Sequence, residues 1–519
     1  MKPFRSAFCF LLTSLIALFI LTPCALAGQK EDTARLHTLF EDILTHQKDA
    51  AVLRGGDLEI KGEIEIVPVE NYYAVTLPDL TFYTLPGGAL HMGRIALNVL
   101  PGDTAGSWKI TMALPSPMLF YAKKEGTPTE IRIGAQNFSG LWNDKINYFS
   151  RLNARYQDIS LSKPQTFTTK IEQINVLSDL KQDKNEYWSG PVNLTAKNLH
   201  STSPLDGSDA SIGLISVDMN IQDYSPDAFS AYQEKIGALA ESYKDDNASI
   251  SPQHLRGLYN LIFDFMGKAS DGLAAKMTLQ DLRFSQPAQQ QGKTKSVHMD
   301  KAGFGYTLSG FRADNVALGL SLFFNGLAIT PQPEDLETVI PETVNVTLKL
   351  DNLPYSKLVA LGDENLKAAQ ISPEAAQNAK AQALLLLPKY LTEAQSHARI
   401  EPLRVENGYY SALLNAAFVA DLNAAKSATG TAKLQLRGLD TMMGYLKEKQ
   451  DTDSAAPEAA KDKINQTLAV LTILQIMGQQ GQNDQGRPVR SYDFELKPDG
   501  ADILNGADLQ TLFSTIKKK

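Results

Sequence analysis

Ser178 and Lys181 are the residues whose types and spacing most directly suggest chemistry. Ser178-Asp-Leu-Lys181 has the S-x-x-K pattern in which penicillin-recognising enzymes place a nucleophilic serine and its lysine partner. A pattern with two fixed positions also arises by chance in a chain of 519 residues, and the companion motifs of that enzyme class are missing. We therefore expect a protein without catalytic activity. An envelope serine hydrolase with an unrecognised site, using a nucleophile such as Ser178, is the alternative.

The histidines, cysteines and glycines do not form a metal or cofactor motif. The spacing of the histidines excludes H-x-H, H-E-x-x-H and H-x₃₋₅-H, since they lie at positions 37, 46, 91, 200, 254, 298 and 397. Gly303, Gly305 and Gly310 have the wrong intervals for a dinucleotide loop. Cys9 and Cys24 both lie in the first 27 residues, which excludes cysteine-ligated metals from the remainder. We expect no metal and no cofactor.

The first 27 residues have the pattern of a bacterial export signal. Lys2 and Arg5 precede an almost wholly apolar run from Phe8 to Leu21. The small-x-small pattern of Ala25-Leu26-Ala27 then predicts cleavage before Gly28. The rest of the chain is expected to lie in the periplasm.

An uncleaved anchor is the rival interpretation of the same segment. Ser6 to Ala27 is about as long as the ~20 residues that a membrane-spanning helix requires. The protein would then be anchored in the inner membrane and face the periplasm, because Lys2 and Arg5 stay inside. Lipidation at Cys24 is disfavoured, since Pro23 stands where a small residue is usual.

Composition excludes one class of partner. The formal net charge is −8, and it becomes −10 when Lys2 and Arg5 are removed with the signal. Nucleic-acid binding depends on neutralising phosphates with Lys and Arg, so we expect no nucleic-acid partner.

Behind the signal, residues 28–50 are predicted to be an amphipathic helix and residues 51–216 a β-rich region. Apolar residues recur at helical spacing between Leu36 and Leu44. From Leu58 to Ile66 the apolar and charged residues alternate, which is typical of a strand with one face buried and one in water.

The region 217–519 contains a strand–helix–helix–strand pattern three times, in units near 217–285, 344–407 and 431–500. Each unit opens on a strand with three alternating apolar residues, at 217–223, 346–352 and 432–438. Two helical stretches follow, and a strand resumes at 277–279, 400–402 and 492–494. Three similar intervals indicate an internal repeat.

The helices carry more apolar residues than one buried stripe requires. The helix after Ser251-Pro252 has the clearest excess, and we expect its apolar residues to pack in the core or to line a groove for a lipid or a partner protein. The candidate binding surface consists of Leu258, Tyr259, Ile262, Phe263, Phe265 and Met266.

Together these features resemble the YdgA-like group of bacterial envelope proteins, and more distantly the AsmA-like proteins in style. The resemblance covers about residues 217–513. It rests on the export segment, the apolar helix end Leu384–Pro388, the short strand from Ile400, the turn at Gly408 and the closing Leu504-Asn505-Gly506. It implies an envelope location and no assigned activity.

We thus predict an α+β protein with a long, twisted, mainly antiparallel sheet and three helix-hairpin insertions packed on one face. The expected function is non-catalytic binding of an apolar ligand such as a lipid, or of another envelope protein, in maintenance of the cell envelope. An uncleaved N-terminal segment would add membrane association.

Overall fold

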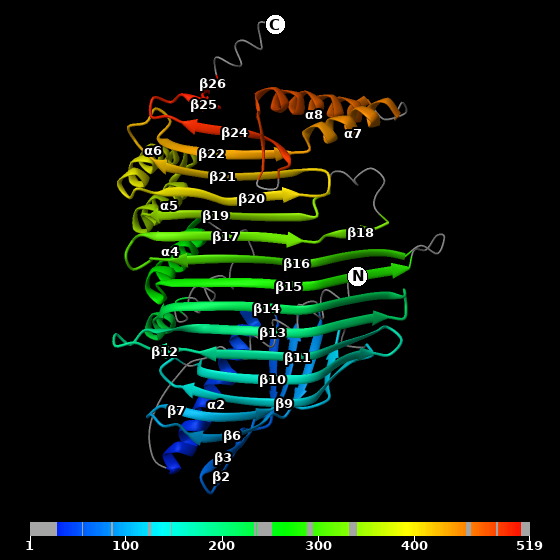
Figure 1. Cartoon of the computed structure of the whole chain (residues 1–519). Helices are drawn as coiled ribbons and strands as arrows, with labels where there is room; N and C mark the ends of the chain where they lie inside the picture. Colours follow the sequence, from blue (N-terminus) through cyan, green and yellow to red (C-terminus); the bar gives the residue numbers. More distant parts are fainter. Residues whose placement is uncertain are drawn as a thin grey trace. The chain divides into compact units, whose positions relative to one another are not determined.

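The computed structural model of the chain describes residues 29–53, 56–84, 87–122, 126–146, 148–232, 235, 252–287, 294–331, 340–452, 458–483 and 486–509. The predicted signal and its cleavage site at Ala25, Ala27 and Gly28 lie outside these residues. The described part is strand-rich with additional helices, and its strand pairings are antiparallel (Figure 1). This confirms the expected mainly antiparallel α+β class.

The chain divides into two compact units. The described residues of 1–247 and 265–294 form unit 1, and those of 248–264 and 295–519 form unit 2.

Unit 1 begins with helix α2 (Gln29–Leu53) and a branched set of short strands. Strand β9 (Thr129–Asn143) pairs with two of them along the same edge, β7 near its C-terminal end and β8 near its N-terminal end. One branch continues β7–β6–β3–β2 and the other β8–β5–β4–β1. The bounds are β1 (Asp57–Lys61), β2 (Glu65–Val69), β3 (Tyr72–Thr76), β4 (Asp79–Thr84), β5 (Gly88–Gly93), β6 (Ala96–Pro101), β7 (Ser107–Ala113) and β8 (Met118–Tyr121).

Long strands extend this sheet in the order β9–β10–β11–β13–β14–β15, with the short β12 paired to β13. They are β10 (Tyr148–Lys163), β11 (Phe167–Asp179), β12 (Lys181–Gln182), β13 (Trp188–Ser203), β14 (Ser208–Tyr224) and β15 (Gly272–Pro287). Their inward face and the short strands enclose a large core, to which α2 contributes Leu36, Leu39, Phe40 and Leu44.

In the long strands of unit 1, the core-facing side chains switch between even-numbered and odd-numbered positions at one transverse row. In β10 the buried side chains are even-numbered from Ser150 to Tyr156 and odd-numbered from Ile159 onward. Asp158 lies between them with a φ of 52°, and Asn198 and Asp281 have φ values of 50° and 51° at the corresponding points of β13 and β15. A left-handed residue inserted in a strand turns the following side chains to the other face, so each strand keeps its apolar side inward.

Unit 2 contains one antiparallel sheet in the order β16–β17–β19–β20–β21–β22–β24–β25–β26, with β18 beside β16 and β23 beside β24. Thr294 at the start of β16 belongs to unit 1. The strands are β16 (Thr294–Ser309), β17 (Val316–Asn325), β18 (Ala328–Thr330), β19 (Thr343–Leu353), β20 (His397–Glu406), β21 (Ser411–Ala420), β22 (Ala428–Arg437), β23 (Gln479–Gln482), β24 (Pro488–Leu496), β25 (Asp502–Leu504) and β26 (Ala507–Asp508).

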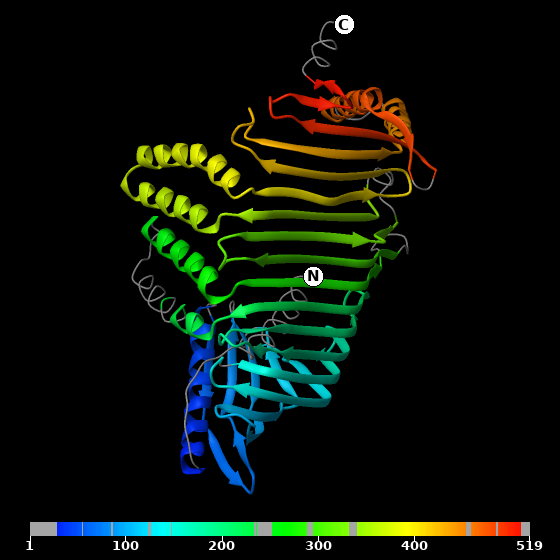
Figure 2. The same ribbon diagram turned by 60° about the vertical axis from the view of Figure 1, so that its left-hand side comes forward.

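Helices interrupt the strand sequence in three places. Residues 226–232 and helix α4 (Pro252–Ala269) lie between β14 and β15 in the sequence. Helices α5 (Tyr355–Ile371) and α6 (Pro373–Glu393) lie between β19 and β20, and helices α7 (Leu439–Thr452) and α8 (Glu458–Met477) follow β22. Figure 2 shows the α5–α6 pair projecting from one end of its strands. None of the helices in the described part of the chain combines the length and apolar character needed to cross a membrane.

Candidate functional site

The sheet of unit 2 has one face that is apolar across seven consecutive strands. Alternation puts every second side chain on this face, and the register aligns them into transverse rows. One row contains Tyr306, Leu320, Leu348, Ile400, Ala416, Ala432 and Phe494, each paired with the next. A neighbouring row contains Leu308, Leu318, Leu350, Ala398, Phe418, Gly430 and Leu496. We call this surface of β16, β17, β19, β20, β21, β22 and β24 the apolar sheet face.

The apolar sheet face is partly accessible to solvent, most of all at β16 and β17. Leu322 is 52% exposed, and Phe304 and Leu320 are also exposed. In the row that contains Ile400, Ala416 is buried, Leu320 is exposed and the other members are half-buried. At the far edge Tyr492 is buried, and its hydroxyl donates to the carbonyl oxygen of Leu474 in α8 at 2.6 Å.

Unit 1 uses the same alternation to build a closed core. The inward residues of β10 and β11 are covered, with Tyr156 at 3% and Ile174 at 5% exposure. The core clusters of buried apolar residues that the structure describes lie in unit 1. An apolar face of a sheet is normally buried against another layer, so its exposure in unit 2 requires a reason.

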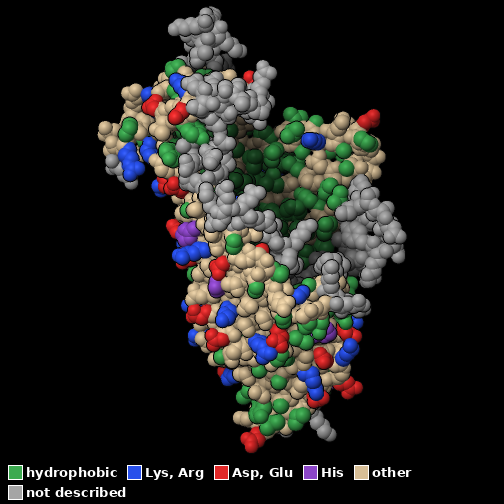
Figure 3. Space-filling model, turned by 90° about the vertical axis from the view of Figure 1, so that its right-hand side faces the viewer, with side chains coloured by type: hydrophobic (Ala, Val, Ile, Leu, Met, Phe, Trp, Pro, Cys, Tyr) green, Lys and Arg blue, Asp and Glu red, His purple; other side chains and the backbone are tan. Residues whose placement is uncertain are grey.

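Figure 3 shows that the surface of unit 2 is hollowed and that hydrophobic side chains gather in the hollow, in the upper part of the view. We assign the hollow to the apolar sheet face because the opposite face of the same strands carries charged pairs. A concave apolar surface suits a narrow, flexible ligand better than a flat protein surface.

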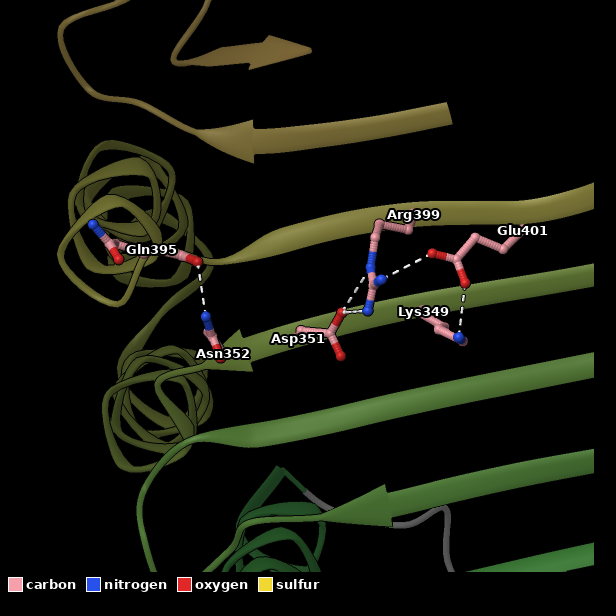
Figure 4. Close-up of polar contacts among 6 residues, drawn as sticks. All are labelled: Lys349, Asp351, Asn352, Gln395, Arg399 and Glu401. Carbon is pink, nitrogen blue, oxygen red and sulfur yellow. Dashed lines mark hydrogen bonds and ion pairs between the residues drawn. The ribbon is translucent and has the colours of Figure 1, made fainter. Parts of the chain in front are cut away.

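The opposite face of the sheet is stabilised by an ion-pair network between β19 and β20 (Figure 4). The Arg399 guanidinium donates to Asp351 at 2.6 Å and to Glu401 at 2.9 Å, and Lys349 donates to Glu401 at 2.7 Å. The hydrogen bond with Asp351 raises the pKa of Arg399, and the hydrogen bond from Lys349 lowers the pKa of Glu401. These charges keep that face hydrated, so the two faces of the sheet differ sharply in character.

Helix α4 is fixed to α5 within unit 2 by polar contacts. Arg256 donates two hydrogen bonds to the Asp363 carboxylate, at 2.6 and 2.8 Å, and Asn260 donates a third at 2.8 Å. The hydrogen bond from Arg256 is the largest influence on Asp363 and lowers the pKa of its carboxyl. A Cβ at Gly362 would lie 1.9 Å from the hydroxyl oxygen of Tyr259, so the helices approach closely at this point.

The six residues that the sequence suggested as a binding surface do not form one surface. Tyr259 and Phe263 contact α5, since the hydroxyl of Tyr259 donates to the Val359 carbonyl at 3.2 Å and the Phe263 ring lies 6.2 Å from that of Tyr355. Leu258 and Ile262 are exposed.

The other two members of that set lie in the unit 1 part of α4. The ring of Phe265 stacks on Tyr232 at a centroid distance of 4.0 Å, and Met266 is half-buried. The six side chains therefore divide between helix packing and solvent.

The structure does not join Ser178 and Lys181 into a catalytic pair. Ser178 is buried, and its hydroxyl donates to the Phe149 carbonyl oxygen at 3.4 Å. Lys181 lies at the surface, with its ammonium group 3.4 Å from Asp179. Within the described ranges no group of His, Cys, Asp and Glu side chains is arranged to hold a metal ion.

The sequence analysis did not identify the apolar sheet face as a site, although the alternation of apolar residues that produces it was visible. The alternation in 346–350 and 432–436 was used to predict strands, and the apolar side was expected to be covered by helix pairs. The described helices leave most of it uncovered. Comparison of the chain with family models, with curated proteins and with solved structures gives no match.

Proposed function

We propose that the protein binds the acyl chains of a lipid on the apolar sheet face. The observation that carries this proposal is an apolar surface seven strands wide that lies open in a hollow of unit 2. Seven strands at about 4.8 Å spacing make this surface about 29 Å wide, which accommodates a long hydrocarbon chain.

The energetics favour a long chain over a short one. Each buried methylene contributes about 0.8 kcal/mol, whereas association costs about 4–15 kcal/mol in lost freedom. A ligand therefore needs on the order of ten or more buried methylenes to bind well. Phospholipids and fatty acids meet this requirement.

We also propose that the protein is non-catalytic, is exported to the periplasm and serves the cell envelope. The pattern of residues 1–27 supports export, and an inner-membrane anchor that faces the periplasm is the other form of the same proposal. The burial of Ser178, and the pairing of Lys181 with Asp179 rather than with Ser178, support a non-catalytic protein over the alternative of a serine hydrolase. The envelope location also fits the resemblance to the YdgA-like group.

We further propose that the three helical insertions are copies of one repeated unit in a single long sheet. The expected strands at 217–223 and 346–352 lie in β14 and β19, the one at 432–438 lies in β22 up to Arg437, and each precedes helical residues. A repeat of this kind extends the same apolar side from strand to strand.

The test is native mass spectrometry with lipid extraction on protein purified from its own envelope. We expect a phospholipid or fatty acid to co-purify, and to be lost in Phe304→Asp because the new carboxylate would have to be desolvated by the ligand. Thr307→Asp is the matched control, since Thr307 lies on the same strand, is exposed and belongs to the opposite face.

Three outcomes would contradict the proposal. The first is protein that carries no lipid and takes up none from vesicles. The second is equal loss of lipid in Phe304→Asp and Thr307→Asp. The third is a stoichiometric protein partner in place of lipid, which would assign the apolar sheet face to a protein interface.

A further inference from the structure

Unit 1 contains a trough on the outward face of its long strands, away from its core. Strands β7, β9, β10, β11 and β13 form its floor, and its volume is about 820 Å³. This surface is distinct from the apolar sheet face, so an inference drawn from it goes beyond lipid binding and does not depend on it.

Two neighbouring transverse rows of side chains line the trough. The first row contains Thr111, Ser139, Asn153, Leu177 and Asn193, each paired with the next across the strands. It presents hydroxyl and amide groups, which both donate and accept hydrogen bonds, around one leucine that is 46% exposed. The amide nitrogen of Asn193 already donates to Asp218 at 2.8 Å, so Asn193 offers mainly its carbonyl oxygen to a ligand.

The second row adds charge and another apolar side chain. Lys109, Leu141, Arg151 and Asp179 are paired in this order across the same strands. Leu141 lies beside the first row, so the trough has an apolar floor with polar groups around it.

Positively charged residues outnumber negatively charged residues in the lining of the trough. Arg151 and Lys181 share Asp179, at 3.9 and 3.4 Å, and Lys109 pairs with Asp103 at 2.7 Å. Three cations thus face two carboxylates, although the whole chain is acidic with a net charge of −8. A ligand with a negative group would be attracted to this end of the trough.

The pairing of the strands restricts the kind of ligand that can bind in the trough. Strands β10 and β11 are paired along both edges, so they offer no free backbone groups to an added peptide strand. A ligand that crosses them must be recognised by side chains alone. A sugar chain has C–H faces that suit exposed leucines, and hydroxyls that suit amides and hydroxyls.

We propose that this trough binds an oligosaccharide that carries carboxylate groups. The sugar rings lie over Leu141 and Leu177, the amide and hydroxyl row binds their hydroxyls, and Arg151 donates to a carboxylate. A guanidinium is suited to this because its N–H groups match the two carboxylate oxygens.

The test is calorimetric titration of the full chain with trigalacturonate, with maltotriose as the neutral sugar and tricarballylate as a carboxylate without sugar. We expect trigalacturonate to bind and each of the other two to bind at least about tenfold more weakly, since each lacks one class of contact worth more than about 1.4 kcal/mol. Binding should weaken as salt is raised.

Two variants locate the site. Arg151→Gln should weaken trigalacturonate binding about tenfold or more, the effect of losing one charge-assisted hydrogen bond. Arg132→Gln is the control, because Arg132 is exposed on β9 but lies outside the trough. Leu177→Gln should also weaken binding of trigalacturonate. Unchanged tryptophan fluorescence would show that unit 1 remains folded in each variant.

The proposal is overturned if trigalacturonate does not bind, or if tricarballylate binds equally well, which would indicate a site for small anions. It is also overturned if Arg132→Gln and Arg151→Gln have the same effect. Lipid binding should be unchanged in Arg151→Gln, so a failure of this proposal can be distinguished from a failure of the proposed lipid function.

Discussion

Phe304 of β16 and Leu322 of β17 lie directly opposite each other in the antiparallel ladder, and both side chains are about half exposed, at 47% and 52%. In unit 1 the cross-strand pair Tyr156 and Ile174 is nearly inaccessible. The two pairs have similar chemistry, so the difference between a core and an open surface comes from what covers the sheet.

The first prediction is that Phe304→Ser and Leu322→Ser destabilise the protein only modestly. Each side chain is about half buried, so each substitution should lower the unfolding free energy by about 1–1.5 kcal/mol. Ile174→Ser, in contrast, should cost about 3 kcal/mol or more, because it leaves a cavity and a buried hydroxyl. Urea unfolding followed by circular dichroism measures these effects. A cost for Phe304→Ser equal to that for Ile174→Ser would show that the apolar sheet face is covered in solution.

Much of this architecture was predictable from local patterns. A helix was expected at residues 28–50, where α2 spans Gln29–Leu53, and the alternation around Leu348 and Leu434 falls in β19 and β22. Alternation shows which side of a strand is apolar, but not whether another layer covers it. Whether a face is covered depends on the paths of segments far away in the sequence, such as α2 and the short strands in unit 1.

The change of parity in unit 1 was also hidden from the sequence. Asp158 in β10 and Asn198 in β13 are ordinary polar residues, and their left-handed conformation depends on the neighbouring strands. Gly134 is part of the reason, since a Cβ there would lie 2.8 Å from the Cβ of Asp158. A strict period of two therefore fails in the middle of these strands.

The second prediction concerns the left-handed conformation of Asn198, which lies in the transverse row where the core-facing positions switch. Asn198→Gly should be tolerated because glycine adopts a φ of 50° without strain. Asn198→Val should destabilise unit 1 by about 1–3 kcal/mol, because a β-branched residue resists this conformation. The three tryptophans of the chain, Trp108, Trp142 and Trp188, all lie in unit 1, so tryptophan fluorescence during urea unfolding reports on it. Equal stability of the valine and glycine variants would contradict the argument.

The third prediction concerns the length of the bound acyl chain. If methylenes are buried on the apolar sheet face, affinity should rise by up to about fourfold for each added methylene, the equivalent of about 0.8 kcal/mol. Displacement of a fluorescent fatty acid by saturated fatty acids of increasing length measures this dependence. Phe304→Asp should weaken binding across the series, while Thr307→Asp should leave it unchanged. An affinity that does not depend on chain length would place the contacts at the headgroup.

The fourth prediction concerns the ion pair that joins α2 to the sheet. Arg35 donates to Asp144, the two side chains are 11% and 7% exposed, and the guanidinium also lies 5.0 Å from the centre of the Trp108 ring. Burial raises the pKa of the Asp144 carboxyl above its ordinary value of 3.8, and Arg35 opposes this effect. The folded chain therefore binds this proton more tightly than the unfolded chain does. The contribution of Asp144 to stability falls as pH rises from 3.8 through its raised pKa.

Arg35→Met leaves the Asp144 carboxylate buried without its partner, so it should cost about 3–5 kcal/mol at pH 7. At pH 4 the cost should be smaller, because Asp144 without Arg35 has a still higher pKa and is then largely protonated. Asp144→Asn added to Arg35→Met should recover part of the loss at pH 7 and little at pH 4, since the amide removes the unpaired charge. Urea unfolding followed by tryptophan fluorescence at both pH values gives the comparison. An equal cost of Arg35→Met at pH 4 and pH 7 would mean that the carboxylate gains hydration when Arg35 is removed, and that α2 is held mainly by its apolar residues.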